Sequence, residues 1–304
     1  MSALGASGQS ALRAGLVVLL LLPLAASAAA ALRARGGRFW AALLAVVYLM
    51  PSLMLAYAWG TARWSPVHHP WSRELLYVGL RAAQLLPVAA LAWVLVPTAQ
   101  DDRIAWFQWR RLTRAPGPLS TLRRWWKAHA RPGLAAASLV FLFAFAEFEI
   151  ASLFVLDAWA VWCFDALATG KPVGTVLARA WPGLALQAAV VVAALLLLAR
   201  RGGVPDERPP PRPAVVVGGV VIVVAAVVVV VVPAAVVLAG AMGAWRPGSI
   251  GGEIGTSLLL ALAVAACVIP VVAAVVHLPP AWRAWTVALV VAPGLLGSLG
   301  VGMI

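Results

Sequence analysis

The chain has 304 residues, of which 63% are hydrophobic and 11% are charged, and its formal net charge is +13. A typical soluble domain is about 45–50% apolar and about 25% charged. This composition excludes a soluble enzyme, a disordered chain and a nucleic-acid-binding domain, so we expect no nucleic-acid partner. The two cysteines lie far apart in the sequence and predict neither a disulfide framework nor a metal cluster.

Long apolar stretches predict membrane-spanning helices, because a helix needs roughly 20 apolar residues to cross the bilayer. We expect an all-α, polytopic transmembrane helix bundle with about 8 spans, at residues 14–32, 39–59, 75–97, 133–156, 177–199, 214–240, 255–276 and 284–302. A Pro/Arg-rich linker, 201–213, separates a five-span part, 1–200, from a three-span part, 214–304. The helix pair in 255–302 faintly repeats the pair in 14–59, which predicts a partial second repeat.

The basic residues predict the orientation, because Lys and Arg accumulate in cytoplasmic loops. With the N-terminus outside, the inside loops 33–38, 98–132, 200–213 and 277–283 hold sixteen of the 23 basic residues. We therefore expect a multi-pass protein of the bacterial cytoplasmic (inner) membrane, in contact with the lipid bilayer. Arg13, an apolar run and Ala26-Ser27-Ala28 also fit a cleavable signal peptide, but the arginines that follow at 33–38 oppose export.

The inside loop 98–132 is long, basic and rich in Trp. Part of it fits an interfacial segment, with Trp at the lipid headgroups and Arg on phosphates. Pro116-Gly117-Pro118 predicts a break between two short helices along the inner surface, because proline at 118 lacks a backbone N–H and proline at 116 disfavours helix before it. The loop ends in Arg131-Pro132-Gly133-Leu134 at the start of the fourth span.

This helix–turn–helix layout resembles the cytoplasmic loop of ABC importer permeases. Within that family it is most similar to the iron(III), thiamine and polyamine group. In that family the loop is followed by Arg-Pro-x-Leu, a helix of small residues and an acid next to Phe. Here Arg131-Pro132-Gly133-Leu134 and Glu147-Phe148 stand in that order. The acid, glycine and Leu-Pro pair of the family's loop motif are absent, so position and layout carry the resemblance.

The resemblance implies a permease subunit that moves a small solute or metal complex such as iron. It would work with cytoplasmic ABC ATPase subunits, an external solute-binding protein and, in one arrangement, a second permease chain. The ATPase-coupling residues would be Gln108, Arg111, Leu112, Arg114, Gly117, Leu119 and Leu122. If the three-span part 214–304 begins a second copy of the core, that copy stops at residue 304 without a second ATPase-contacting loop, which departs from the family's pattern.

Two carboxylates fall within the predicted fourth span, Glu147 and Glu149, on either side of Phe148. Intramembrane carboxylates usually face a cavity or a partner. Glu147, Phe148 and Glu149 are therefore candidates for a translocation path or gate, and we expect Glu147 to face the protein interior. The alternative is a hydrogen bond between helices. The resemblance also places an acid at Glu147, but it gives no support for Glu149.

Catalytic motifs are missing from the sequence: it has no Walker A, H-E-x-x-H or G-x-S-x-G pattern. We therefore expect no enzymatic activity, no cofactor and no metal site, and we expect ATP hydrolysis on partner subunits. Two other interpretations stay open. One is a structural or assembly membrane subunit without transport activity, and the other is a membrane-embedded enzyme, whose polar residues would include Arg81, Gln84 or Arg179 beside the two carboxylates.

Overall fold

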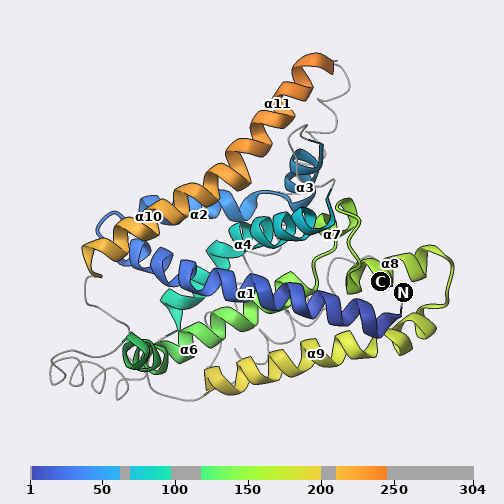
Figure 1. Cartoon of the computed structure of the whole chain (residues 1–304), viewed down its shortest axis with the longest axis horizontal. Helices are drawn as coiled ribbons and strands as arrows, with labels where there is room; N and C mark the ends of the chain where they lie inside the picture. The colour runs from blue at the N-terminus through green and yellow to red at the C-terminus, as the bar shows by residue number, and fades with distance from the viewer. Residues whose placement is uncertain (1, 62–68, 97–117, 200–209, 245–304) are drawn as a thin grey trace, which may run out of the picture. The chain divides into compact units, whose positions relative to one another are not determined.

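The computed structural model describes residues 2–61, 69–96, 118–199 and 210–244, and the regular secondary structure in these residues is entirely helical (Figure 1). The predicted all-α class is thereby confirmed. The chain divides into two compact units, Met1–Ala234 and Ala235–Ile304. The packing and the sites described below belong to the first unit.

The helices of the described residues follow one another with short breaks. They are α1 (Ala3–Arg33), α2 (Gly37–Leu49), α3 (Ser52–Thr61), α4 (Pro70–Leu95), α6 (Pro118–Phe145), α7 (Glu149–Leu153), α8 (Trp159–Ala168), α9 (Val173–Ala199), α10 (Arg212–Ala226), the π-helix η2 (Val227–Val231) and α11 (Val232–Ala244). A tight turn joins α1 to α2, where Gly36 has φ +89°, a left-handed conformation that glycine adopts without steric conflict.

Four stretches of helix in the described residues are long and apolar enough to cross a membrane. They are Ala3–Arg33, Pro70–Leu95, Val173–Ala194 and Arg212–Ala239, and α2 with α3 makes a fifth if the bent pair is one span. This supports a polytopic membrane protein. The predicted spans at 255–276 and 284–302 lie outside the described residues, so the total of about eight stays a prediction.

Two predicted spans are not single helices. The span expected at 39–59 consists of α2 and α3, which are bent by 75° at Met50-Pro51. Proline has no backbone N–H, and its ring collides with the carbonyl four residues earlier, so the helix ends before Pro51. The span expected at 133–156 ends at Phe145, and α7 follows after a short non-helical segment.

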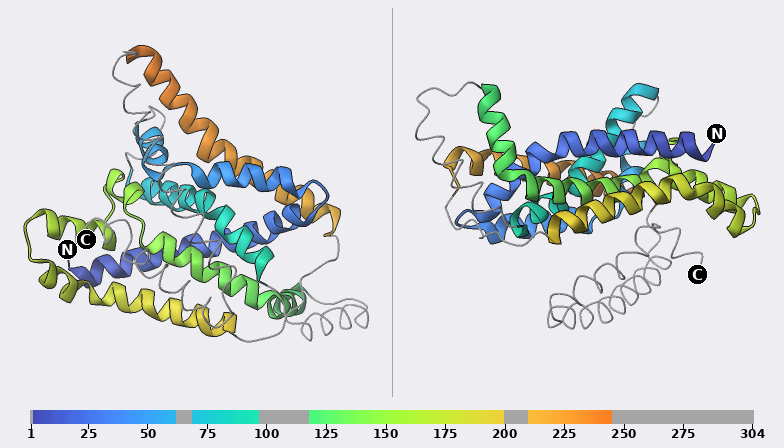
Figure 2. Two further views of the ribbon diagram at one scale, coloured as in Figure 1. Left: turned by 180° about the vertical axis from the view of Figure 1, so that it is seen from behind. Right: turned by 90° about the horizontal axis from the view of Figure 1, so that it is seen from below.

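The segment 98–132, predicted to lie inside, differs from the prediction at its C-terminal end. The described part of helix α6 runs without interruption from Pro118 to Phe145, and the break expected at Pro116-Gly117-Pro118 falls at the edge of the described residues. The second helix of the loop and the start of the fourth span are therefore one element. Pro132 lies inside it, and Figure 2 shows that α6 changes direction along its length, as proline in a helix interior causes. The short helix α8 was not predicted.

Helix α1 organises the first unit, since it packs against α4, α6, α9 and α10 (Figure 1). Its contact with α10 is unusually close. A Cβ atom added at Gly218 of α10 would lie 2.0 Å from the backbone oxygen of Ser27 in α1. Small residues allow such backbone approach between helices in membranes. The glycine-rich start of α10 is therefore a packing surface.

Candidate functional site

A stripe of polar side chains runs along one buried face of α4. Tyr77, Arg81 and Gln84 are spaced four and three residues apart, which places them on the same side of a helix. They are 2%, 7% and 6% exposed. Burying a charge and an amide is unfavourable unless both are hydrogen-bonded. All three side chains form hydrogen bonds with groups at a break between two helices, and in this sense they hold the breaks.

The first break, between α2 and α3, is held by Gln84. Its Nε2 donates to the backbone oxygen of Met50 at 3.2 Å and to the Ser52 hydroxyl at 2.9 Å. Met50 ends α2, and its carbonyl would otherwise lack a partner in an apolar surrounding. In the other direction, the Oε1 atom of Gln84 accepts from Nη1 of Arg81 at 2.6 Å. One amide thus joins the broken span to the buried guanidinium.

The second break, between α6 and α7, is held by Arg81 and Tyr77. The Nη2 atom of Arg81 donates to the backbone oxygen of Phe143 at 2.6 Å, and the Tyr77 hydroxyl donates to that of Ala144 at 3.4 Å. These carbonyls belong to the last turn of α6, where helical partners run out. The two breaks are therefore linked through one face of α4.

Glu147 forms the other side of the second break. It is 5% exposed, which confirms its predicted interior placement. Its two carboxylate oxygens accept from the backbone N–H groups of Ile150 at 2.7 Å and Ala151 at 3.0 Å. Glu147 thus caps α7, where free N–H groups and the helix dipole favour a negative charge. Both of these partners of Glu147 lie in the next turn of the same segment. The alternative of a hydrogen bond between helices stays open for Glu149.

The other two candidate gate residues sit beside this cap. Glu149 is the first residue of α7, and Phe148 immediately precedes it. The Phe148 ring contacts that of Phe164 in α8, with ring centroids 5.0 Å apart. Arg81 bonds to the end of α6 and Glu147 to the start of α7, so the two residues lie at opposite sides of one break. The sequence suggested Arg81 only for an alternative function.

A third irregularity adjoins the two breaks. The π-helix η2 precedes Pro233, which has no N–H to offer the carbonyl four residues earlier, and a π-turn is one way to absorb that defect. The indole nitrogen of Trp59 in α3 donates to the backbone oxygen of Val228 at 3.1 Å. One apolar cluster contains buried residues from all three places, including Leu55, Ile150 and Val229. Helices α3 and α7 also pack against each other.

A separate ion pair joins the first half of α1 to the first turns of α4. Arg13 binds Glu74 through two bonds, Nε to Oε2 at 2.7 Å and Nη2 to Oε1 at 2.6 Å. Arg13 also donates to the backbone oxygen of Asp157, and Ser10 accepts from the N–H of Trp159 at 2.8 Å. Sequence reasoning missed this pair. The available signal was that Arg13 and Glu74 each directly precede a predicted span.

Two of the predicted coupling residues lie in the described part of the chain. Gln108, Arg111, Leu112, Arg114 and Gly117 lie outside the described residues. Leu119 and Leu122 belong to the first turns of α6. Among the described residues, no three His, Cys, Asp or Glu side chains are grouped so that they could hold a metal ion.

No protein-family model, no curated protein and no solved structure matches the chain. Its function therefore has to be argued from the polar stripe of α4 and the breaks that this stripe holds.

Proposed function

We propose that the chain is the permease subunit of a bacterial ABC importer, which moves a small solute across the cytoplasmic membrane. The observation that supports this best is the meeting of two helix breaks on Tyr77, Arg81 and Gln84. Non-helical backbone at membrane depth is tolerated only where protein buries it or where it lines a cavity. Transporters commonly build their substrate sites and gates from such discontinuous helices.

In this proposal the segment Glu147-Phe148-Glu149 is the gate. The carboxylate of Glu147 holds the start of α7, while Arg81 holds the end of α6. A shift of α7 relative to α6 would separate these two charged groups from their backbone partners and expose them to a path. The Nε atom of Arg81 is buried and has no hydrogen-bond partner among the described residues. It could donate to a solute that carries an acceptor group.

The proposed coupling to ATP hydrolysis uses the continuity of α6. Leu119 and Leu122, at its beginning, belong to the segment assigned to the ATPase contact, together with Gln108, Arg111, Leu112, Arg114 and Gly117. Phe145, at its end, lies two residues before Glu147. A helix of 28 residues is about 42 Å long at 1.5 Å per residue. Movement of its first turns by an ATPase would therefore reach the gate directly, which a flexible loop would not allow.

The resemblance supplies two further parts of the proposal: an external solute-binding protein and the iron(III), thiamine and polyamine range of solutes. The distribution of basic residues supplies an N-terminus outside. The orientation can be tested separately. A Ser120→Cys variant should resist an impermeant thiol reagent in intact cells and react in inverted vesicles. Reaction in intact cells would refute the orientation.

The decisive experiment is isolation of the tagged chain from its native membrane together with its partners. We expect an ATPase subunit to co-purify and a Leu119→Cys variant to cross-link to it. Replacing Pro116-Gly117-Pro118 with Gly-Ser-Gly should leave membrane insertion intact but abolish uptake driven by ATP. A structural membrane subunit or a membrane-embedded enzyme would show no cross-link between Leu119→Cys and an ATPase. Absence of that cross-link would reject the importer proposal.

A further inference from the structure

The Arg13–Glu74 pair lies where the membrane surface is expected. Both residues directly precede apolar stretches, predicted at 14–32 and 75–97, so both side chains fall at the level of the lipid headgroups. The side chain of Arg13 is 7% exposed, whereas that of Glu74 is 35% exposed. The guanidinium is therefore covered, and the carboxylate is the charged group that a molecule from outside can reach.

A large cavity of about 930 Å³ opens beside this pair, between the first half of α1 and the start of α4. Glu74, Arg13 and Gln9 are its polar lining residues, and leucine side chains such as Leu16 and Leu19 line the rest. The cavity thus combines an Arg–Glu ion pair, whose carboxylate is the more exposed member, with a long apolar surface. This is the chemical pattern of an amphiphile, with a small polar head and a hydrocarbon tail.

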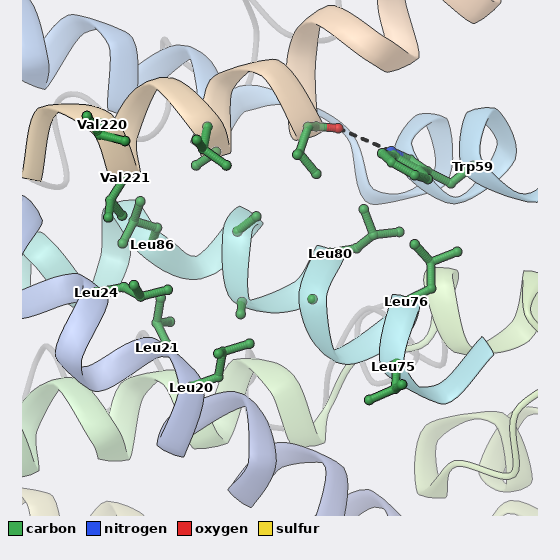
Figure 3. A pocket seen from close by; sticks show the side chains of 16 residues that line it. Leu20, Leu21, Leu24, Trp59, Leu75, Leu76, Leu80, Leu86, Val220 and Val221 are labelled. Carbon is green, nitrogen blue, oxygen red and sulfur yellow. Dashed lines mark hydrogen bonds between the residues drawn. The ribbon is translucent and has the colours of Figure 1, made fainter. Parts of the chain in front are cut away.

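A second cavity of about 400 Å³ continues the groove toward α10 (Figure 3). The two cavities share Leu20 and Leu75 as lining residues. The walls of the second cavity are almost entirely apolar, and the indole N–H of Trp59 is already bonded to the backbone oxygen of Val228. A ligand in the second cavity therefore needs no hydrogen-bonding group, and a hydrocarbon chain can fill this cavity.

The rim of the groove faces outward. Leu12, Leu19, Trp71 and Leu75 line the first cavity and are 65%, 71%, 84% and 73% exposed. Because α1 and α4 are long and apolar enough to cross a membrane, we expect Leu19 and Leu75, which lie within the apolar stretches, to face bilayer lipid. The groove is therefore open to the bilayer along its side, and a lipid can enter without crossing water.

We propose that this groove binds one phosphatidylethanolamine molecule. Its ammonium group would lie on the carboxylate of Glu74, and one acyl chain would follow α1 from Leu16 toward the cavity at α10. The ammonium fits better than an anionic head for two reasons. Glu74 is the reachable charge, and Arg13 already donates to Glu74, Gln9 and the backbone oxygen of Asp157. A phosphatidylcholine head would lack the N–H donors that a carboxylate accepts.

The groove can be filled without disturbing the ion pair. A Cβ atom added at Gly8 or Gly79 meets nothing within 4 Å, and these residues line the first and second cavities respectively. The variants Gly8→Phe and Gly79→Phe should therefore fold and occupy the lipid's space. Gly174 in α9 also has open space around its added Cβ and lines neither cavity, so Gly174→Phe is the matched control.

The test is titration of the delipidated full chain in detergent with defined lipids, followed by native mass spectrometry. The wild-type chain and Gly174→Phe should retain one phosphatidylethanolamine, with a Kd at least fivefold lower than that for phosphatidylcholine or phosphatidylglycerol. Each filling variant should raise the Kd at least tenfold. Equal binding of all three lipids, or unchanged binding by both filling variants, would overturn the proposal.

Discussion

Two buried glutamines in the first unit lead to opposite predictions for the same substitution. Gln84 is 6% exposed and bonds to Arg81, Met50 and Ser52, whereas Gln187 in α9 is 1% exposed and neither its Oε1 nor its Nε2 has a partner among the described residues. Replacement by leucine removes a hydrogen-bonded amide at one position and an unsatisfied one at the other.

The magnitudes follow from those partners. In Gln84→Leu, loss of the charged hydrogen bond from Arg81 lowers the free energy of unfolding by about 1.5–3 kcal/mol, and loss of the partner of the Met50 carbonyl lowers it by about 1–3 kcal/mol. Burial of the leucine side chain raises it by about 1.5–3 kcal/mol. The net effect is a free energy of unfolding lower by roughly 2 kcal/mol. Gln187→Leu removes a buried amide without partners and should instead stabilise the fold by about 1–3 kcal/mol.

The assay is reversible unfolding of each variant in mixed micelles, with helix content followed by circular dichroism and the free energy extrapolated to zero denaturant. Ser52→Ala serves as the small control, because it removes a single hydroxyl acceptor and leaves the Met50 and Arg81 bonds of Gln84 intact. If both leucine variants shifted stability in the same direction, the assignment of these hydrogen bonds would be refuted.

Three further predictions concern other parts of the first unit. Val155 has φ +51° at the end of α7, where glycine usually stands, so Val155→Gly should raise the unfolding free energy by about 1 kcal/mol, and a decrease would contradict the strain. Gly218→Val should separate α10 from Ser27 of α1 and lower the thermal midpoint, whereas Gly15→Ala, whose Cβ meets nothing within 4 Å, should not. Burial raises the pKa of the Cys163 thiol to about 12, which keeps it protonated at neutral pH. In a variant without the other cysteine, maleimide should therefore label Cys163 only after unfolding, and rapid native labelling would contradict this.

Sequence patterns were sufficient for the class of structure and for several of its parts. Long apolar runs predicted helices at 14–32, 75–97 and 177–199, and the structure has helices there, because a chain in lipid must satisfy its backbone within each segment. The interior placement of Glu147 followed from the unfavourable free energy of a carboxylate in lipid.

The helix breaks were harder to predict, and their reasons differ. Pro51 marks the first break, but hydropathy averaged over twenty residues runs across it. The second break has neither proline nor glycine, and it depends on Glu147 bonding to the backbone of Ile150 and Ala151. A side chain that competes with the helix for backbone groups leaves no periodic signal.

The sequence by itself determined that this chain is helical, apolar and suited to a bilayer, because those properties depend on composition and on local backbone chemistry. Only the tertiary structure decided that Arg81 and Gln84 of α4 hold two breaks far away in the chain, and that Arg13 pairs with Glu74. The physical reason is that burying a polar group without a hydrogen bond is unfavourable, and which partner lies within hydrogen-bond distance depends on how helices distant in sequence pack together.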